Sequence, residues 1–380
     1  VYLNDFMRLM GWNANTNLTF GSFHIDIAPI IIVAFFTTLL VFGTKIGARV
    51  DGAMTVLKIA IVFFVVIVGF FYVKASNFTP FIPPSQPAST VEGSSAVTGV
   101  MTQPLWQFAT GMTPSVYGVP GILSGAALVF FAFIGFDVVA TASEETKNPH
   151  KNVPLGIGVG MLLIIVMYML VAVVTTGMVS YADLAKQDSP SLATAFELVG
   201  ADWAAKIISF GIVLGLATVV MVLLLGLTRI VFAMSRDGLL PRGLSKTGKH
   251  GTPAALQIVV GAVVALVAAF FDIGVLSDMV NIGTLSAFTL VAISIPIMRK
   301  KRPDLPRAFK MPGNPWIPIL IAVANFWLML NLSVLTWIRF VVWLVVGFAI
   351  YFGYGYWHAR LGKGDLTETL SAETDKAVNG

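Results

Sequence analysis

Long apolar runs, such as Ile30 to Phe42 and Ile59 to Val73, constrain the fold of this chain more than any other feature. Only 11% of its 380 residues are charged. A soluble domain carries about 25% charged residues, so this chain cannot build a surface that faces water. Inside a bilayer every backbone polar group must be bonded internally, which leaves helices or a closed barrel. Barrel strands alternate strictly, so the runs predict an all-α polytopic membrane protein.

Reactive side chains are scarce. The chain has no cysteine and only four histidines, which removes disulfides and thiolate metal sites. No two histidines have the spacing of metal ligands, and no nucleophile–base pair is evident, so we expect neither an enzyme nor a cofactor. The formal net charge of +5 follows the predicted membrane topology, and no nucleic-acid partner is expected.

The apolar runs predict nine membrane-spanning helices, since one span needs about 20 apolar residues. The last two form a helical hairpin. The expected ranges are 26–44, 52–73, 121–142, 153–179, 203–234, 254–271, 275–298, 316–335 and 337–357.

Basic residues predict the orientation. Most of the 24 Lys and Arg residues fall in alternate loops and in the tail, with a dense group between 299 and 315. Loops rich in Lys and Arg face the cytoplasm, so the C-terminus is expected there. Nine spans then place Val1 outside, although no export signal precedes it. We therefore expect an odd number of preceding spans to be missing from this sequence.

One predicted helix contains Gly135 and Asp137 within an otherwise apolar stretch. This pattern is typical of a transporter helix that is interrupted so that its backbone carbonyls face a ligand. The alternative is a continuous helix in which Gly135 packs closely against a neighbour. In an interrupted helix, a substrate ammonium would meet the carbonyls of Phe131, Ala132 and Ile134. The rings that could close over it are those of Phe131, Phe133 and Phe136.

Acidic residues in this region have two interpretations each. A carboxylate within a membrane is costly, so Asp137 is by default a functional residue. A position near the cytoplasmic end would instead leave Asp137 hydrated. Glu144 and Glu145 follow at the end of the helix, where we expect gating or structural ion pairs on the cytoplasmic side.

Lys58 lies about one and a half turns inside the second predicted helix. Its ammonium could extend along the helix to the interface, as lysines near helix ends do. Alternatively, apolar surroundings favour the neutral form of a lysine, and such a residue can bind and release a proton during a conformational change. The residues themselves leave both interpretations open.

Several motifs lie along nearly the whole chain, in the order in which one known family carries them. They are Phe130-Phe-Ala-Phe-Ile-Gly-Phe-Asp, Ser143-Glu-Glu-Thr-Lys-Asn-Pro, Thr228-Arg, Ser235-Arg-Asp-Gly-Leu-Leu-Pro, Asn281-Ile-Gly-Thr-Leu-Ser-Ala-Phe and Arg302-Pro-Asp-Leu-Pro-Arg-Ala-Phe. In these motifs the chain resembles the amino acid–polyamine–organocation superfamily. Within it, the chain is similar to the bacterial permeases that are like cationic amino acid transporters.

The resemblance implies a LeuT-like transporter fold, with a five-plus-five inverted repeat and two additional helices. Nine of the twelve helices would be present, the fourth to the twelfth. The implied segments are an extracellular segment at 1–25, the last two helices of the first repeat at 26–73, an extracellular loop at 74–120, the second inverted repeat at 121–298, a basic cytoplasmic loop at 299–315, two additional helices at 316–357 and a cytoplasmic tail at 358–380.

The resemblance also implies a function. It predicts a proton-coupled amino-acid symporter that works by alternating access in the plasma membrane of a bacterium. The alternatives are an exchanger without obligatory proton coupling and a membrane receptor that does not transport. The expected partners are an amino-acid substrate and the lipid bilayer, with a small membrane protein left open.

The implied site residues form three groups. The substrate-binding residues are Phe131, Ala132, Phe133, Ile134 and Asp137. The proton-coupling residues are Lys58, Gly215 and Thr218, and the gating residues are Phe131, Glu144 and Glu145. Many relatives carry Tyr at the position of Phe133, so a hydroxyl contact there is missing. For the polar Asn281, Thr284 and Ser286, hydrogen bonding between helices and gate lining are both open.

Overall fold

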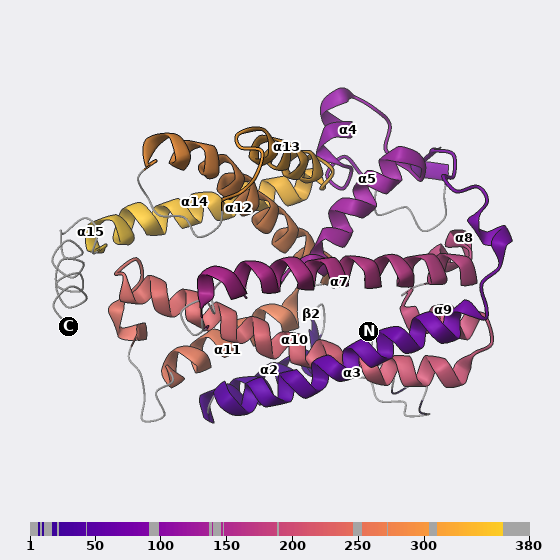
Figure 1. Ribbon diagram of the computed structural model, residues 1–380, viewed down its shortest axis with the longest axis horizontal. Coiled ribbons are helices and arrows are strands. Elements are labelled where there is room, and N and C mark those ends of the chain that lie inside the picture. Colours follow the sequence, from indigo (N-terminus) through magenta and orange to yellow (C-terminus); the bar gives the residue numbers. More distant parts are fainter. Residues whose placement is uncertain are drawn as a thin grey trace. The chain divides into compact units, whose positions relative to one another are not determined.

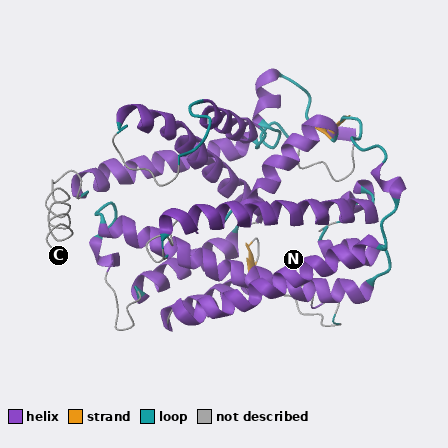
Figure 2. Ribbon diagram, in the orientation of Figure 1, coloured by secondary structure: helices purple, strands orange, loops and turns teal. Residues whose placement is uncertain are grey.

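A computed structural model describes most of the chain. The described residues are 7, 10, 17–20, 23–42, 44–90, 99–136, 139, 146, 148–187, 190–245, 253–271, 273–303 and 310–359. Helices dominate them (Figure 2). The chain divides into two compact units. The first comprises Val1–Asn15, Thr55–Gly215 and Phe271–Phe340, and the second Thr16–Met54, Leu216–Phe270 and Val341–Gly380.

The first unit holds most of the helices (Figure 1). They are the larger part of α3 (Thr44–Phe70), α4 (Leu105–Thr110), α5 (Gly118–Val129), α7 (Pro149–Met178), α8 (Tyr181–Ala185), α9 (Leu192–Leu198), the first part of α10 (Asp202–Arg236), α12 (Ile273–Lys301), α13 (Trp316–Leu330) and the start of α14 (Val334–Ile350). Its short elements are the 3₁₀ turns η1 (Ala75–Phe78), η2 (Ala88–Thr90) and η4 (Phe130–Phe133), and the paired strands β3 (Gln86–Pro87) and β4 (Ser115–Val116).

The second unit contains α2, α11 and the remaining parts of α3, α10 and α14. Its elements are the antiparallel strands β1 (Asn17–Phe20) and β2 (Phe23–Asp26), α2 (Ile27–Phe42), the 3₁₀ turn η6 (Arg242–Ser245), α11 (Ala254–Phe270), the π-helical turn η7 (Tyr351–Gly355) and α15 (Tyr356–His358). Its core forms where Phe36 and Leu40 of α2 pack with Leu224 of α10 and Leu256 of α11.

Each predicted helical range contains a helix in the described part of the chain. Five helices are long and apolar enough to cross a membrane, namely Gly52–Phe70, Lys151–Met178, Asp202–Arg236, Ile273–Lys301 and Val334–His358. Four shorter apolar helices are Ile27–Val41, Gly118–Phe133, Ala254–Phe270 and Trp316–Leu330. An all-helical protein with several membrane spans is therefore confirmed, whereas the total number of spans and the LeuT-like repeat stay predictions.

The exposed surface of α7 is apolar along most of its length. Leu155, Val159 and Leu162 are 57%, 59% and 64% exposed. Exposing this much hydrocarbon to water would be costly, because burial of apolar area stabilises a soluble fold by about 25 cal/mol per Å². In lipid the same surface carries no such cost, since the tails are equally apolar.

Two hydrophobic cores hold the first unit together. In one, Val65 of α3 packs with Val174 of α7, Phe196 of α9 and Ile208 of α10. In the other, Ala127 of α5 is covered by residues of α12, α13 and the turn that follows α13. These residues are Ile282, Leu285, Met329 and Leu332. The second core places the end of α5 directly against α12.

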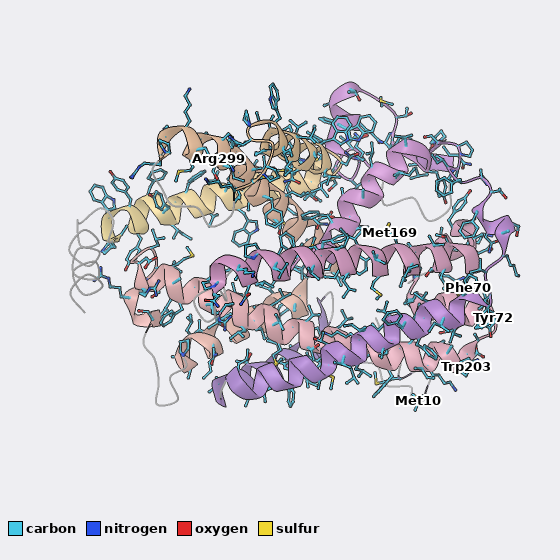
Figure 3. The ribbon with its side chains drawn as sticks, in the orientation of Figure 1. Met10, Phe70, Tyr72, Met169, Trp203 and Arg299 are labelled. Carbon is cyan, nitrogen blue, oxygen red and sulfur yellow. The ribbon has the colours of Figure 1, made fainter. Side chains whose placement is uncertain are left out.

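The two ends of the first unit differ in chemistry. Phe70, Tyr72 and Trp203 lie at one end of it, where α3 finishes and α10 begins (Figure 3). Arg299 lies at the end of α12, and its guanidinium donates to the carbonyl of Met311 at 2.8 Å. Aromatic rings favour membrane interfaces and basic residues favour the cytoplasmic side, which fits the predicted topology. The orientation itself stays a prediction.

The loop predicted at 74–120 contains more regular structure than expected. Within it, β3 pairs with β4, and α4 ends at Gly111 in the left-handed conformation. The segment before α4 also pairs with the turn after α13, since Leu105 N donates to Leu332 O at 3.0 Å and Val334 N donates to Gln103 O at 3.1 Å. These backbone bonds hold the segment before α4, although its own residues form only turns, bends and one isolated bridge.

The predicted short turn between the last two helices is present, but it lies elsewhere, and the packed helical hairpin stays a prediction because α13 packs mainly against α12. We expected the turn near Leu335 to Arg339, whereas α13 ends at Leu330 and α14 begins at Val334. Ser333 stabilises the start of α14, because its hydroxyl accepts from Thr336 N at 3.2 Å. The hydroxyl of a serine before a helix satisfies one of the free N–H groups there.

A cap of the same kind begins α8. The Ser180 hydroxyl accepts from Asp183 N at 3.2 Å and donates to Asp183 Oδ2 at 2.8 Å, and Lys186 lies 3.4 Å from the same carboxylate. The hydrogen bond from Ser180 contributes most, and the contact with Lys186 adds to it, in holding the pKa of Asp183 below its usual range.

Gly69 tests the packing of the first core. A Cβ at this position would overlap Val174 and lie 2.8 Å from Met178 Sδ. We expect Gly69→Ala to destabilise the protein by about 1–3 kcal/mol, as overpacking of a filled core does. The measurement is the melting temperature of the purified protein in detergent.

The matched control is Gly158→Ala, since Gly158 lies within α7 and nothing comes within 4 Å of its added Cβ. This variant should melt at or slightly above the wild-type temperature, because Ala has the higher helix propensity. Equal melting temperatures for the two variants would contradict the described packing.

Candidate functional site

The helix that contains the predicted interruption is broken. The α-helical part of α5 stops at Val129 and tightens into η4. Ile134 then becomes extended, with φ −67° and ψ 139°, and Gly135 has φ +119°. Of the two interpretations of the sequence, the structure confirms the interruption.

Gly135 is needed for its backbone conformation and not for close packing. An added Cβ would meet nothing within 4 Å, so the alternative of a packing glycine is wrong. A φ of +119° is rarely accessible to residues with a side chain. The chain can therefore leave the helical path at this position only because a glycine is there.

Two side chains from other helices donate hydrogen bonds to carbonyls of the broken segment. The Tyr168 hydroxyl of α7 donates to Ala132 O at 2.7 Å. The Asn281 amide of α12 donates through Nδ2 to Leu128 O at 3.3 Å. A carbonyl oxygen has two lone pairs, so each can accept a second donor. The interruption is therefore stabilised from outside while its carbonyls keep capacity for a ligand.

The aromatic residues of the break fall into two groups. Phe133 packs edge-on against Tyr168, with ring centroids 5.1 Å apart. Phe136 lies 5.2 Å from Phe288 of α12, and Phe130 lies 6.1 Å from the same ring. The ring of Phe131 is 43% exposed. Phe133 and Phe136 thus pack against rings of α7 and α12, whereas Phe131 is largely exposed.

Lys58 and Gly215 lie side by side in the first unit. A Cβ added to Gly215 would lie 3.5 Å from Lys58 Cγ, 3.7 Å from Cε and 3.9 Å from Cδ. The stem of Lys58 on α3 therefore runs across the face of α10 at Gly215, and Lys58 as a whole is half-buried. Thr218 is buried three residues further along α10.

The structure describes only part of the predicted site. Asp137, Glu144 and Glu145 lie outside the described residues. For Phe131, Ala132, Phe133, Ile134, Lys58, Gly215 and Thr218 the structure gives positions, and their roles in binding, coupling and gating stay predictions. Within the described ranges, no three His, Asp or Glu side chains gather as a metal site would require.

Two polar residues on the helices that contact the broken segment were not predicted as site residues. Asp278 of α12 accepts a hydrogen bond from the Thr336 hydroxyl at 3.1 Å and interacts electrostatically with Arg339. It could have been noticed, because it is the only acidic residue in the predicted span 275–298. Tyr168 gives no such signal, since a tyrosine in an apolar helix is common.

A cavity of about 600 Å³ lies at the other end of α5. Tyr117, Gly121 and Ser124 line it from α5 and the residue before it, and Thr176 and Tyr181 line it from the end of α7 and from α8. Ser124 precedes the start of η4 by six residues, or about 9 Å along a helix. The cavity and the break are therefore separate features of α5.

Long apolar helices whose exposed surfaces are apolar, one of them interrupted at Phe130 to Gly135, are typical of a multi-pass helical membrane protein. A family model described as amino acid permease matches residues 2–355, nearly the whole chain. The chain belongs to this amino acid permease family.

The chain is similar to three named transporters. It is 39% identical to the branched-chain amino acid permease BcaP of Bacillus subtilis (strain 168), over 95% of this chain and 72% of the relative. It is 38% identical to the methylthioribose transporter of the same organism, over 88% of this chain and 65% of the relative. The match to the vacuolar cationic amino acid transporter 4 of Arabidopsis thaliana is 34% over 74% of this chain and 42% of the relative. The chain thus spans only part of each relative's length.

Gly135 provides a direct test of the break. We expect Gly135→Ala to lower amino-acid uptake at least fivefold, because a side chain at positive φ costs about 1–3 kcal/mol and would shift the carbonyls that follow. The measurement is uptake of a radiolabelled amino acid by vesicles that contain the intact protein.

The control is Gly125→Ala in the regular part of α5, where an added Cβ also meets nothing within 4 Å. It should transport at the wild-type rate. If Gly135→Ala transported equally well, the break would not depend on the conformation of Gly135.

Proposed function

We propose that the protein is a proton-coupled amino-acid symporter that works by alternating access in the plasma membrane of a bacterium. The observation that carries the proposal is the broken helix at Phe130 to Gly135. Interrupted helices in transporters place backbone carbonyls and helix ends against the substrate near the middle of the membrane. Membership of the amino acid permease family supports an amino acid as that substrate.

In this proposal the substrate ammonium binds the backbone carbonyls of the break. An ammonium has three N–H donors and needs several acceptors where little water is present. The carbonyls of Phe131, Ala132 and Ile134 belong to a segment that has left the α-helical pattern. Tyr168 fixes the direction of the Ala132 carbonyl by donating to it. Phe131 would close over the bound substrate as a gate.

A branched-chain, neutral amino acid is the substrate class that we propose. The support is the 39% identity to a relative named as a branched-chain amino acid permease, which extends over 95% of this chain. The apolar residues beside the break, including Phe131 and Ile134, offer contacts suited to such a side chain. An apolar contact of this kind discriminates less sharply than a hydrogen bond would.

Lys58 is proposed to carry the coupling proton. Its stem lies on Gly215, the residue that the family resemblance places beside it. A lysine amine that moves between hydrated and apolar surroundings changes its proton affinity, because the charged form loses solvation. Binding and release of this proton would then favour different conformations of the transporter.

A second candidate is an amino-acid exchanger without obligatory proton coupling. The observation that favours it is the half-buried state of Lys58, which allows its ammonium to remain hydrated at the interface. A lysine that stays charged throughout the cycle would couple no proton.

Variants of Lys58 and Gly215 distinguish the proton-coupled symporter from the exchanger. In proteoliposomes that contain the intact protein, an inside-alkaline pH gradient should drive at least tenfold less leucine accumulation in Lys58→Ala than in the wild type. Gly215→Leu should cause the same loss, because its branched side chain would displace the lysine stem. The measurement is radiolabelled leucine uptake with and without the gradient.

Gly215→Ala is the matched control, because its Cβ would make ordinary contacts of 3.5–3.9 Å with Lys58. It should accumulate leucine as the wild type does. If leucine uptake by the wild type did not depend on the pH gradient, the exchanger would be favoured. If uptake by Lys58→Ala depended on the gradient as the wild type does, Lys58 would not carry the coupling proton.

Competition against leucine uptake tests the substrate class. Valine and isoleucine should compete well, whereas lysine and methylthioribose should compete at least tenfold more weakly. The deaminated analogue 4-methylpentanoate keeps the side chain and carboxylate of leucine but has no ammonium to bind the carbonyls of the break. Equal competition by this analogue would contradict the proposed role of those carbonyls.

A further inference from the structure

Asn281 is completely buried, with 0% exposure, in the second core of the first unit. Its side-chain nitrogen donates to Leu128 O of α5 at 3.3 Å. Its side-chain oxygen, Oδ1, is also buried and has no hydrogen-bond partner among the described residues. The amide nitrogen of Asn281 therefore has a partner, whereas its amide oxygen is an acceptor without a donor among the described residues.

The carbonyl that Asn281 holds lies at the start of the break. In a continuous α-helix, Leu128 O would accept from the N–H of Ala132, four residues later. The chain has changed to a 3₁₀ turn by Phe130, so that pattern ends here. The N–H of Phe130 still reaches Leu128 O. A carbonyl that has left the regular helical pattern inside an apolar layer can accept a further donor, and Asn281 supplies one from another helix.

The face of α12 that carries Asn281 contacts the break on both sides. Phe288 is seven residues further on, two turns along the same face, and its ring packs against Phe130 before the break and Phe136 after it. At the other end of this face, the carboxylate of Asp278 accepts from the Thr336 hydroxyl of α14. The α12 helix is thus anchored to α14 and contacts the broken helix through Asn281 and Phe288.

We propose that Asn281 is a positioning residue, which fixes where α5 breaks and thereby where the carbonyls of Phe131 to Ile134 point. This inference rests on the proposed function, because those carbonyls are the proposed ammonium site. Asn281 acts through Leu128 and need not touch the substrate.

The unsatisfied oxygen favours this role over a purely structural one. A buried acceptor without a donor costs free energy. A residue that only filled the core would need neither this oxygen nor the amide nitrogen. Asn281 carries both, and its nitrogen holds one specific carbonyl of α5.

The test compares Asn281→Leu with Asn331→Leu in the intact, purified protein. Asn331 is a matched control because it is also buried, donates through Nδ2 to a helix carbonyl, Trp327 O at 2.8 Å, and has an Oδ1 without a partner. It lies at the end of α13, however, and holds a carbonyl of its own helix.

Each variant removes one side-chain donor from a helix carbonyl, so we expect the two variants to change the melting temperature by similar amounts. Asn281→Leu alone should weaken leucine binding about tenfold. It should also speed hydrogen exchange of the peptide that spans residues 128–136, because Leu128 O loses the donor from α12 and the last turn of α5 opens more often. Asn331→Leu should match the wild type in both measurements.

The two measurements distinguish the failure of this inference from that of the proposed function. Wild-type protein that binds no amino acid would refute the proposed function, while the exchange of residues 128–136 would still decide the role of Asn281. Unchanged exchange and unchanged affinity in Asn281→Leu would overturn the inference. If this variant does not fold, Asn281→Ala removes the same donor without adding volume, and the same two outcomes apply to it.

Discussion

The structure depends on one constraint, namely that backbone polar groups within an apolar layer must find partners inside the protein. Continuous helices such as α7 meet this requirement along most of their length by themselves. The broken helix α5 does not, because its hydrogen-bond pattern changes at Phe130 and ends at Ile134. Tyr168 and Asn281 reach it from α7 and α12 and supply donors to two of its carbonyls. The break thus depends on three helices, of which α5 and α12 carry motifs of the family resemblance and α7 does not.

This arrangement relates structure to transport. A segment that has left the helical pattern has carbonyls with room for a further donor, and an ammonium is a suitable one. The same segment can change conformation more readily than a complete helix, because fewer internal hydrogen bonds must break. Fixed partners, Phe288 against Phe136 and Tyr168 against Phe133, limit which parts of it move. Phe131 is the more exposed ring, as a moving gate would require.

Much of the helical framework could be predicted, because apolar length is a local property of the sequence. The positive φ of Gly135 is likewise local, which is why its surroundings predicted an interruption. The neighbourhood of Lys58 and Gly215 came from the family resemblance, since residues 157 positions apart give no local sign of contact. The pairing of the segment before α4 could not be predicted, because the backbone that it bonds to lies in the turn after α13, far along the chain. The role of each predicted site residue in transport stays a prediction.

The sequence by itself therefore determined that lipid surrounds most of the protein, that the secondary structure is helical, and where one helix is interrupted. Each of these follows from the hydrophobicity or backbone freedom of neighbouring residues. Only the tertiary structure decided which donors complete the break. The sequence left Asn281 open between hydrogen bonding and gate lining, and it gave no sign of Tyr168, until their partners on α5 were known. It also decided that Asp278 is held by Thr336 and that the stem of Lys58 lies on Gly215. Contacts between distant helices depend on how their surfaces pack, and no single stretch of sequence contains that information.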